Sequence, residues 1–406
     1  MGQNHSSIRK TSNKVKIALQ IRWFLFLALG VGLAFPGAYG LQNTSVYGLI
    51  AVTIFCAFRL KVRPSIPAIL FVTVGYFIYL LGFEVIADQN WSAFLKKIPL
   101  LLSLLVLIPP TKDEKNVFFN SIGISTIVSC MYLWAHHFLE LVPEERWLMS
   151  AYSYTFLTES LGWQPIYTAI SYSIGGLFWM NQLQFSPHRW WKILGMIGIG
   201  ILFITLIFLS ARMAFIAFIF SSFLVVPANR RWIYGVGIGI AIALFFINPV
   251  LKERLTKAVS GSERYAGGSI RLEKWKAAKE VSLNHWLFGV SSGKTQLKLE
   301  EQYQKQDFQL GIQQRYHAHQ QWLQNAVEGG IFGIAFLLLA FVSFFTRHFH
   351  KDDQLILAVG LFILLNTFTE SICERQSGMI WFCIIFLTGF VQKSDNLSSV
   401  VHKESL

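Results

Sequence analysis

The apolar residues of this chain are gathered into long blocks, and this clustering constrains the fold more than any other feature of the sequence. Each block runs for roughly 17 to 22 residues, about the length that a helix needs to cross a ~30 Å hydrocarbon core. Only 14% of the 406 residues are charged, whereas soluble domains carry about 25%. The blocks are continuously apolar and do not alternate, which excludes a transmembrane β-barrel. The sequence therefore predicts an all-α polytopic membrane protein.

About twelve membrane-spanning helices can be placed, with boundaries good to a few residues. The first block follows basic residues, as a signal peptide does, but its length and the many later spans favour an uncleaved first helix. This gives helices 1–9 in residues 1–247, a large helical loop in 248–325, helices 10–12 in 326–392 and a tail in 393–406. The spans are Ile17–Phe35, Val46–Ala57, Ile66–Val85, Ile98–Ile108, Val117–Phe138, Ile166–Trp179, Ile193–Leu209, Met213–Val226, Ile233–Ile247, Ala326–Phe345, Leu355–Phe368 and Met379–Val391.

Basic residues concentrate in alternate loops, which is the pattern that sets orientation in membrane proteins. With the N-terminus inside, the inward loops are basic and the outward short loops are acidic; Lys96 and Lys97, at the outer end of the fourth span, are the exception. The positive-inside pattern accounts for most of the net charge of +13 without a nucleic-acid partner. We expect the long loop after the ninth span to face outward, into the periplasm if the cell has two membranes.

The long loop is expected to form a small helical cap over the outer face. Arg271–Trp286 has helical spacing, Leu287–Gly293 reads LFGVSSG and predicts a turn, and Lys298–Gln314 again has helical composition. We interpret most lysines of this segment as a solvated face. The first cap helix is expected to bury one stripe, formed by Leu272, Trp275, Ala278 and Val281.

Three polar features converge on the outer side of the membrane. Arg212 falls between the seventh and eighth spans, Arg271 opens the first cap helix, and His317 and His319 precede the tenth span. The arginine fork matches phosphate geometry, although Arg212 alone could equally reach toward lipid headgroups. The positive end of the tenth helix disfavours an imidazolium, so His319 would be neutral and able to accept a proton. The alternative to a catalytic role is that His317 and His319 are interfacial histidines of a solvated loop.

Two arginines and a neutral base favour group transfer from a lipid diphosphate. The arginines would stabilise the leaving diphosphate, while the base activates an acceptor hydroxyl. The sequence has neither an ATP-loop motif nor an Asp-rich metal motif, and the four cysteines have no metal-ligand spacing. We therefore expect no cofactor and no metal. The glycines Gly329, Gly330 and Gly333 are expected to let a neighbouring helix approach the tenth span.

Residues from about Leu194 to Val391 resemble the O-antigen ligase and polymerase-like superfamily of bacterial envelope glycan proteins. The ligase pattern is His, then Asn, Ser or Gln, nine residues, Gly, two residues, then Gly, Thr or Tyr. His319, Gln320, Gly330 and Gly333 match it in phase, whereas His317 does not. The further residues that resemble the family are Arg212, Arg271 with Trp275, the LFGVSSG turn, Glu370 and Arg375.

The resemblance implies an inverting, metal-independent glycosyltransferase of GT-C-like architecture, in the bacterial inner membrane with both termini in the cytoplasm. It would transfer a polysaccharide from undecaprenyl pyrophosphate to a lipid A–core sugar in lipopolysaccharide biosynthesis. His319 would be the general base and Arg212 and Arg271 would bind the pyrophosphate. The further site candidates are His317, Trp275, Glu370 and Arg375.

Two alternative functions remain open. A polymerase would share these parts and take another lipid-linked glycan as its acceptor in place of lipid A–core. A glycolipid transporter would belong to a different class, but its expected inverted repeats and midplane polar residues are not evident. We favour the ligase.

Overall fold

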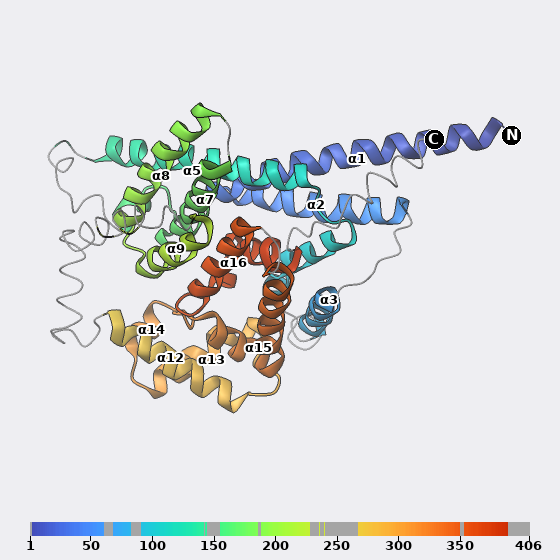
Figure 1. Ribbon diagram of the computed structural model, residues 1–406. Helices are drawn as coiled ribbons and strands as arrows, with labels where there is room; N and C mark the ends of the chain where they lie inside the picture. Colours follow the sequence, from blue (N-terminus) through green and yellow to red (C-terminus); the bar gives the residue numbers. More distant parts are fainter. Residues whose placement is uncertain are drawn as a thin grey trace.

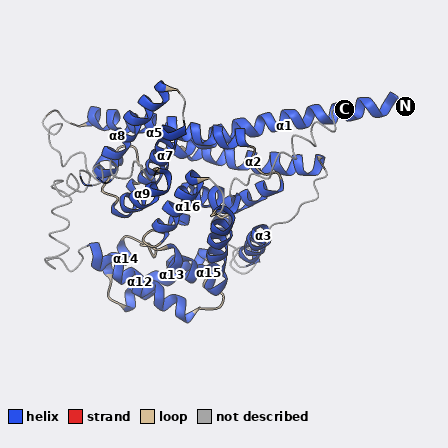
Figure 2. Ribbon diagram, in the orientation of Figure 1, coloured by secondary structure: helices blue, strands red, loops and turns tan. Residues whose placement is uncertain are grey.

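The computed structural model describes residues 2–60, 68–82, 91–141, 143, 155–185, 188–227, 235, 239, 267–349 and 353–388. Within these ranges every regular element is a helix (Figure 2). The described part of the chain is all-α, as predicted. Among the described residues, five helical segments are long and apolar enough to cross a membrane, which indicates a membrane protein. They are Lys14–Ala34, Tyr39–Arg59, Lys112–Glu140, Arg189–Phe208 and Gln321–His348. The total of twelve spans stays a prediction, since the ninth, Ile233–Ile247, lies outside the described residues except for Gly235 and Gly239.

The first part of the chain forms the bundle on which the rest packs. Helix α1 packs against α2 and α5, and α7 packs against α5, α8 and α9 (Figure 1). The predicted spans fall on these helices, but the fourth is a 3-10 helix, η2. The bounds are α1 (Gly2–Ala34), α2 (Tyr39–Arg59), α3 (Ala68–Leu80), α4 (Trp91–Leu95), η2 (Ile98–Leu107), α5 (Lys112–Glu140), α6 (Thr155–Glu159), α7 (Pro165–Phe185), α8 (Arg189–Phe208) and α9 (Arg212–Val225).

One buried ion pair joins α1 to α5. Thr111 caps α5 by accepting from the Glu114 backbone N–H at 3.2 Å, and the Glu114 carboxylate accepts from the Thr111 N–H at 2.8 Å. That capping box fixes the Glu114 carboxylate, which also pairs with the Arg22 guanidinium. Arg22 Nε lies 2.8 Å from Glu114 Oε1, and Arg22 Nη2 donates to Oε2 at 2.9 Å. Both side chains are buried, so each charge needs the other, and the pair fixes how α1 lies on α5.

The second part of the chain forms the cap and the last helices. The cap helices lie along one side of the molecule, away from α1 and α2 (Figure 1). They enclose a small core of their own that includes Ala277, Val281, Leu299, Tyr303 and Phe308. The bounds are α12 (Gly267–Asn284), α13 (Ser292–Lys305), α14 (Gln309–Gln313), α15 (Gln321–His348), α16 (Gln354–Thr367), η6 (Ile372–Glu374), α17 (Gln376–Phe382) and η7 (Cys383–Thr388).

The cap differs from its predicted layout in two places. Helix α12 begins at Gly267, so Arg271 lies one turn inside it and does not open it as expected. The predicted helix Lys298–Gln314 is wrong at its start, since α13 begins at Ser292, and in its continuity, since a break separates α13 from α14. Its end agrees with the structure to one residue, because α14 ends at Gln313. Asp307 takes a left-handed backbone conformation in that break (φ 52°), which ends a right-handed helix. The turn predicted at Leu287–Gly293 corresponds to the connection between α12 and α13.

Helix α15 is interrupted, and the α12–α13 connection fills the interruption. Gly330 has φ 56° and ψ −138°, a conformation essentially reserved for glycine. Backbone hydrogen bonds from the connection replace helical ones there: the Ile331 N–H donates to the Trp286 carbonyl at 2.8 Å, and the Val290 N–H donates to Val327 at 2.8 Å. A Cβ on Gly330 would meet the Leu287 carbonyl oxygen at 2.5 Å. The structure thus pins the start of α15 to the cap through its backbone.

The glycines predicted to admit a neighbouring helix therefore have three different partners. A Cβ on Gly329 would lie 3.4 Å from the Tyr76 hydroxyl of α3, which is a helix contact as expected. At Gly330 the close neighbour is a connecting loop, and at Gly333 it is the Asn325 carbonyl of the same helix. Asn325 also donates its side-chain N–H to the Gly333 carbonyl at 3.1 Å, which stabilises the backbone across the break.

Candidate functional site

A carboxylate joins an arginine of the cap to a histidine at the start of α15. Arg271 donates from Nη2 to one oxygen of Glu370 at 2.8 Å. The other Glu370 oxygen lies 3.4 Å from His319 Nδ1. The Glu370 side chain is 14% exposed, His319 is 26% exposed and Arg271 is 38% exposed, so the group lies at a partly open surface. Three segments of the chain thus bring together three residues that the sequence had singled out.

His319 is held in a strained backbone conformation just before α15 begins. Its φ is 51°, in the left-handed region, which costs a non-glycine residue about 1–3 kcal/mol and is characteristic of functional sites. Two side chains hold the segment there: His317 Nδ1 accepts the His319 backbone N–H at 3.1 Å, and Gln324 accepts the Ala318 N–H at 3.1 Å. His319 lies beside the first turn of its helix, as predicted.

His317 and His319 have different environments, and this difference separates their roles. Burial lowers the pKa of His317 to about 3, and the charges of His319, Lys274 and Arg375 act in the same direction. Burial also lowers the pKa of His319, but the hydrogen bond to Glu370 opposes it. The rings stack with centroids 4.0 Å apart. Because His317 Nδ1 already accepts a backbone N–H, His317 supports its neighbour, and His319 is the histidine with a carboxylate partner.

A carboxylate at Nδ1 also determines which ring nitrogen of His319 can act as a base. Glu370 can only accept, so the neutral ring carries its proton on Nδ1. The lone pair is then on Nε2, which is the atom free to take a proton from a hydroxyl. This arrangement, a base oriented by a third group, recurs wherever histidine activates a hydroxyl.

The segment that carries Glu370 is fixed to α15 by polar side chains. Gln321 accepts the Cys373 backbone N–H at 2.7 Å, and Trp322 donates from Nε1 to Thr367 at 3.2 Å. Tyr167 of α7 adds long contacts to the Ser371 carbonyl at 3.4 Å. Since residues 368–375 connect α16 to α17, these bonds determine where Glu370 meets His319.

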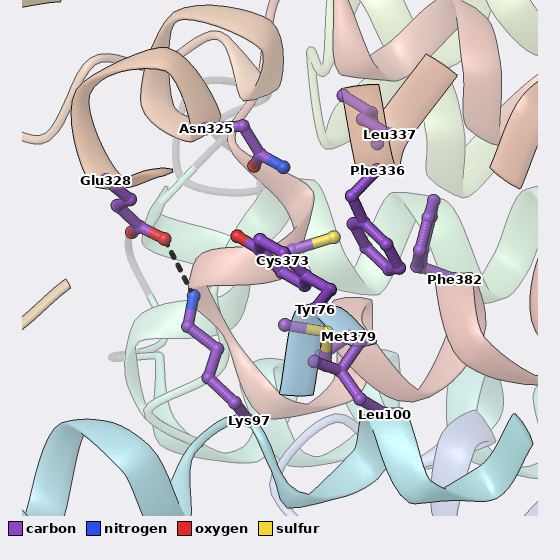
Figure 3. A pocket seen from close by; sticks show the side chains of 10 residues that line it. All are labelled: Tyr76, Lys97, Leu100, Asn325, Glu328, Phe336, Leu337, Cys373, Met379 and Phe382. Carbon is purple, nitrogen blue, oxygen red and sulfur yellow. Dashed lines mark hydrogen bonds and ion pairs between the residues drawn. The ribbon is translucent and has the colours of Figure 1, made fainter. Parts of the chain in front are cut away.

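A buried charged cluster lies at the other end of that segment. Lys97 donates to Glu328 of α15 at 3.0 Å (Figure 3). Lys97 also lies 4.0 Å from Glu374. Gln324 donates to Glu328 at 3.0 Å, so the cluster connects to the side chain that holds Ala318. A cavity of about 20 Å³ beside it, with Tyr76 and further apolar side chains in its wall, has room for about one water molecule.

The lysine that broke the positive-inside pattern therefore has a structural explanation. Lys97 forms an ion pair with the buried Glu328 of α15, which explains a lysine at the end of the fourth predicted span, where the charge pattern predicts none. Glu328 is only 2% exposed and Lys97 is 7% exposed. A buried charge without a partner is strongly destabilising, so this requirement outweighs the topological bias of a single lysine.

The remaining predicted site residues lie at the start of α9, within α12 and just before α17. Arg212 is half-buried at the first residue of α9, and α9 packs against α16, which ends at Thr367, shortly before Glu370. Arg375 is exposed, and its charge helps to lower the pKa of His317. The Trp275 indole N–H is shielded from solvent and has no acceptor among the described residues.

Lys274 is the functional candidate that the sequence analysis missed. The sequence favours a solvated face for most lysines of the cap, but Lys274 is only 5% exposed and its ammonium lies 3.5 Å over the Tyr316 ring. The predicted buried stripe of α12 was wrong at Leu272, which is 50% exposed; the buried face carries Lys274, Ala277, Ala278 and Val281. The alanines at i+3 and i+4 from Lys274 were the signal that placed it on the inner face.

Residues 169–338 match the family model described as O-Antigen ligase. The resemblance predicted from the sequence is therefore confirmed over this range, which contains Arg212, Arg271, His319 and Gly330 but not Glu370. No curated protein matches the chain.

Proposed function

We propose, from the premise that residues 169–338 belong to the O-antigen ligase family, that this chain is a glycosyltransferase of lipopolysaccharide biosynthesis. It would transfer a polysaccharide from undecaprenyl pyrophosphate to a hydroxyl of a lipid A–core sugar, with inversion and without a metal. The contact of Glu370 with both His319 and Arg271 is the observation that carries the proposal. Through this carboxylate the proposed base, His319, and the proposed diphosphate-binding cation, Arg271, lie in one site.

In the proposed step, the acceptor oxygen attacks the anomeric carbon of the sugar bound to the diphosphate. The new glycosidic C–O bond forms while the bond from that carbon to the diphosphate oxygen breaks, and the diphosphate leaves with the electron pair. His319 Nε2 takes the proton of the acceptor hydroxyl. Glu370 stabilises the imidazolium that forms, and attack from the face opposite the leaving group inverts the anomeric centre.

Arg271 and Arg212 are proposed to bind the diphosphate and to stabilise its growing charge. A guanidinium offers paired donors that match phosphate oxygens, and stabilising a leaving group in this way is a large contribution to catalysis. Arg271 keeps donor nitrogens other than the one that contacts Glu370. His317 is proposed as a positioning residue, because its ring accepts the backbone N–H of the base.

The proposal places the site on the periplasmic side of the bacterial inner membrane, with both termini in the cytoplasm. The basic loops on the opposite side of the predicted spans support this orientation. Regions 1–247, 248–325, 326–392 and 393–406 would then be the nine-helix bundle, the periplasmic cap, the last three spans and a cytoplasmic tail. The partners would be the lipid-linked glycan donor, the lipid A–core acceptor and membrane lipids.

A gel profile of envelope glycolipids tests the proposal. A strain that lacks the gene is complemented with the wild type, His319→Ala or His285→Ala, the last a matched control because His285 is an exposed histidine of the same cap. We expect His319→Ala to leave long chains on undecaprenyl pyrophosphate and none on lipid A–core, and His285→Ala to restore the wild-type profile.

Other profiles would contradict the proposal in distinct ways. Single repeat units attached to core would indicate a polymerase instead of a ligase. Full transfer by His319→Ala, at wild-type protein levels, would refute its role as the base. An unchanged profile in the deletion strain would refute transfer to lipid A–core altogether.

A further inference from the structure

Lys274 is a buried lysine that faces the candidate site without a carboxylate of its own. It lies one turn after Arg271 on α12, and residues at i and i+3 share a helix face. Its ammonium lies over the Tyr316 ring at 3.5 Å, three residues before His319. The part of the chain that the structure describes offers it no ion pair, whereas Arg271 is paired with Glu370.

The surroundings of Lys274 do not compensate its charge. Arg271 and Arg375 are cations, His317 and His319 are imidazoles of lowered pKa, and Glu370 is the nearby carboxylate, already shared by Arg271 and His319. The pKa of Lys274 is lowered to about 7, mainly by burial and also by the charge of Arg271, against the opposing charge of Glu370. A cation–π contact offsets only part of the cost of desolvating an ammonium. An anion bound at this face would supply the missing countercharge.

We propose that Lys274 is a further binding residue for the donor, and that its ammonium contacts the diphosphate beside Arg271. This inference rests on the proposed function, because it needs a diphosphate in the site. Arg271 brings a charge that Glu370 neutralises in the empty site, so Lys274 supplies the positive charge that is not already paired. Lys274 lies between Arg271 and Trp275 in the sequence, but it is not one of the residues on which the family resemblance rests.

A consequence follows for the pH dependence of donor binding. A bound diphosphate favours the charged ammonium, so binding takes up a proton wherever Lys274 is neutral in the empty site. Donor affinity is then greatest below the pKa of the empty site, near 7, and falls by up to about tenfold per pH unit above it. His317 and His319 are retained in every Lys274 variant, so a slope that is lost with Lys274 belongs to that residue.

Binding of farnesyl diphosphate to the full-length protein in nanodiscs tests this role. Calorimetry at about pH 6.5 and about pH 8.5, in buffers of different ionisation enthalpy, gives both the dissociation constant and the proton uptake. The variants are Lys274→Met, Lys274→Arg and the control Lys276→Met. Lys276 is an exposed lysine of the same helix, with 54% of its side chain exposed and an ion pair to Glu273 at 3.0 Å.

We expect the wild type and Lys276→Met to bind at least about tenfold more weakly at the higher pH, with proton uptake. Lys274→Arg should bind without that slope, because an arginine stays charged. Lys274→Met should bind about 10- to 100-fold more weakly at the lower pH, the loss expected for one charge-assisted hydrogen bond. The rescue by arginine distinguishes a charge contact from a packing role.

Two results would overturn the inference, and they are distinguishable. Wild-type affinity and slope in Lys274→Met would refute the role of Lys274 while leaving the proposed function intact. Failure of the wild type to bind the probe, together with an unchanged glycolipid profile in the deletion strain, would refute the proposed function and the role of Lys274 with it.

Discussion

Replacing Gly330 by alanine tests whether the break in α15 positions the site. The backbone there has φ 56° and ψ −138°, and an L-residue in such a conformation costs about 1–3 kcal/mol. The added Cβ would also meet carbonyl oxygens of Leu287 at 2.5 Å and Trp286 at 2.7 Å. Pushing these apart weakens the 2.8 Å bond from the Ile331 N–H to Trp286, worth about 1 kcal/mol. The expected total is about 2–4 kcal/mol.

Gly329 provides a matched control one residue earlier in the chain. Its Cβ would lie 3.4 Å from the nearest atom, the Tyr76 hydroxyl, which is ordinary contact. An alanine there should be neutral, or stabilise by the helix propensity of about 0.5–1 kcal/mol. The two variants add the same methyl group to adjacent glycines, so a difference between them isolates the backbone conformation at Gly330.

Hydrogen exchange measured by mass spectrometry reads out the predicted local opening. In Gly330→Ala, the amides of Val290, Ser291 and Ile331, all bonded across the break, should lose protection by about 30- to 1000-fold. In Gly329→Ala their protection should stay at the wild-type level. Equal protection in both variants would refute the reasoning, because it would mean that neither the strain nor the contact matters.

Two further predictions concern the charged groups of the site. Lys97→Met should destabilise the protein by about 3–5 kcal/mol, since it leaves Glu328 buried without its cation. Thermal unfolding should show that Lys97→Met/Glu328→Gln recovers most of this lost stability. No recovery in the double variant would contradict a charge-based explanation. Glu370→Gln removes the carboxylate that raises the His319 pKa. The acid limb of the pH–rate profile should therefore move to lower pH, and the plateau rate should fall. An unmoved acid limb would show that His319 is not the base.

The sequence was sufficient to predict a helical membrane fold and to single out three residues of the candidate site. The long apolar blocks predicted the described spans because membrane burial requires them wherever the chain crosses. Arg271, His319 and Glu370 were chosen from residue types and a family resemblance, and the structure places them in contact. That Glu370 would lie between the other two could not be predicted, because it depends on the path of a connection more than 50 residues further along the chain.

The misassigned residues share a physical cause. The sequence favours a solvated face for most lysines of the cap and does not single out Lys274, since a lysine is seldom buried. Arg271 was placed at a helix start because glycines precede it, whereas α12 begins within those glycines. In both cases the local residue type was a weaker guide than the packing of α12 on α15, a tertiary contact that no local pattern reveals.

The group Arg271–Glu370–His319 and the cluster Lys97–Glu328–Glu374 are connected through shared segments of the chain. The Lys97 cluster therefore has a role beyond stability. Glu370 and Glu374 lie on one short connection, and α15 meets it at both ends, with His319 just before its first residue and Glu328 within its second turn. Gln324 joins the ends, since it accepts the Ala318 N–H and donates to Glu328. A shift of Lys97 would therefore move both the backbone that presents His319 and the connection that presents Glu370. The geometry of the proposed base thus depends on an ion pair outside the candidate site.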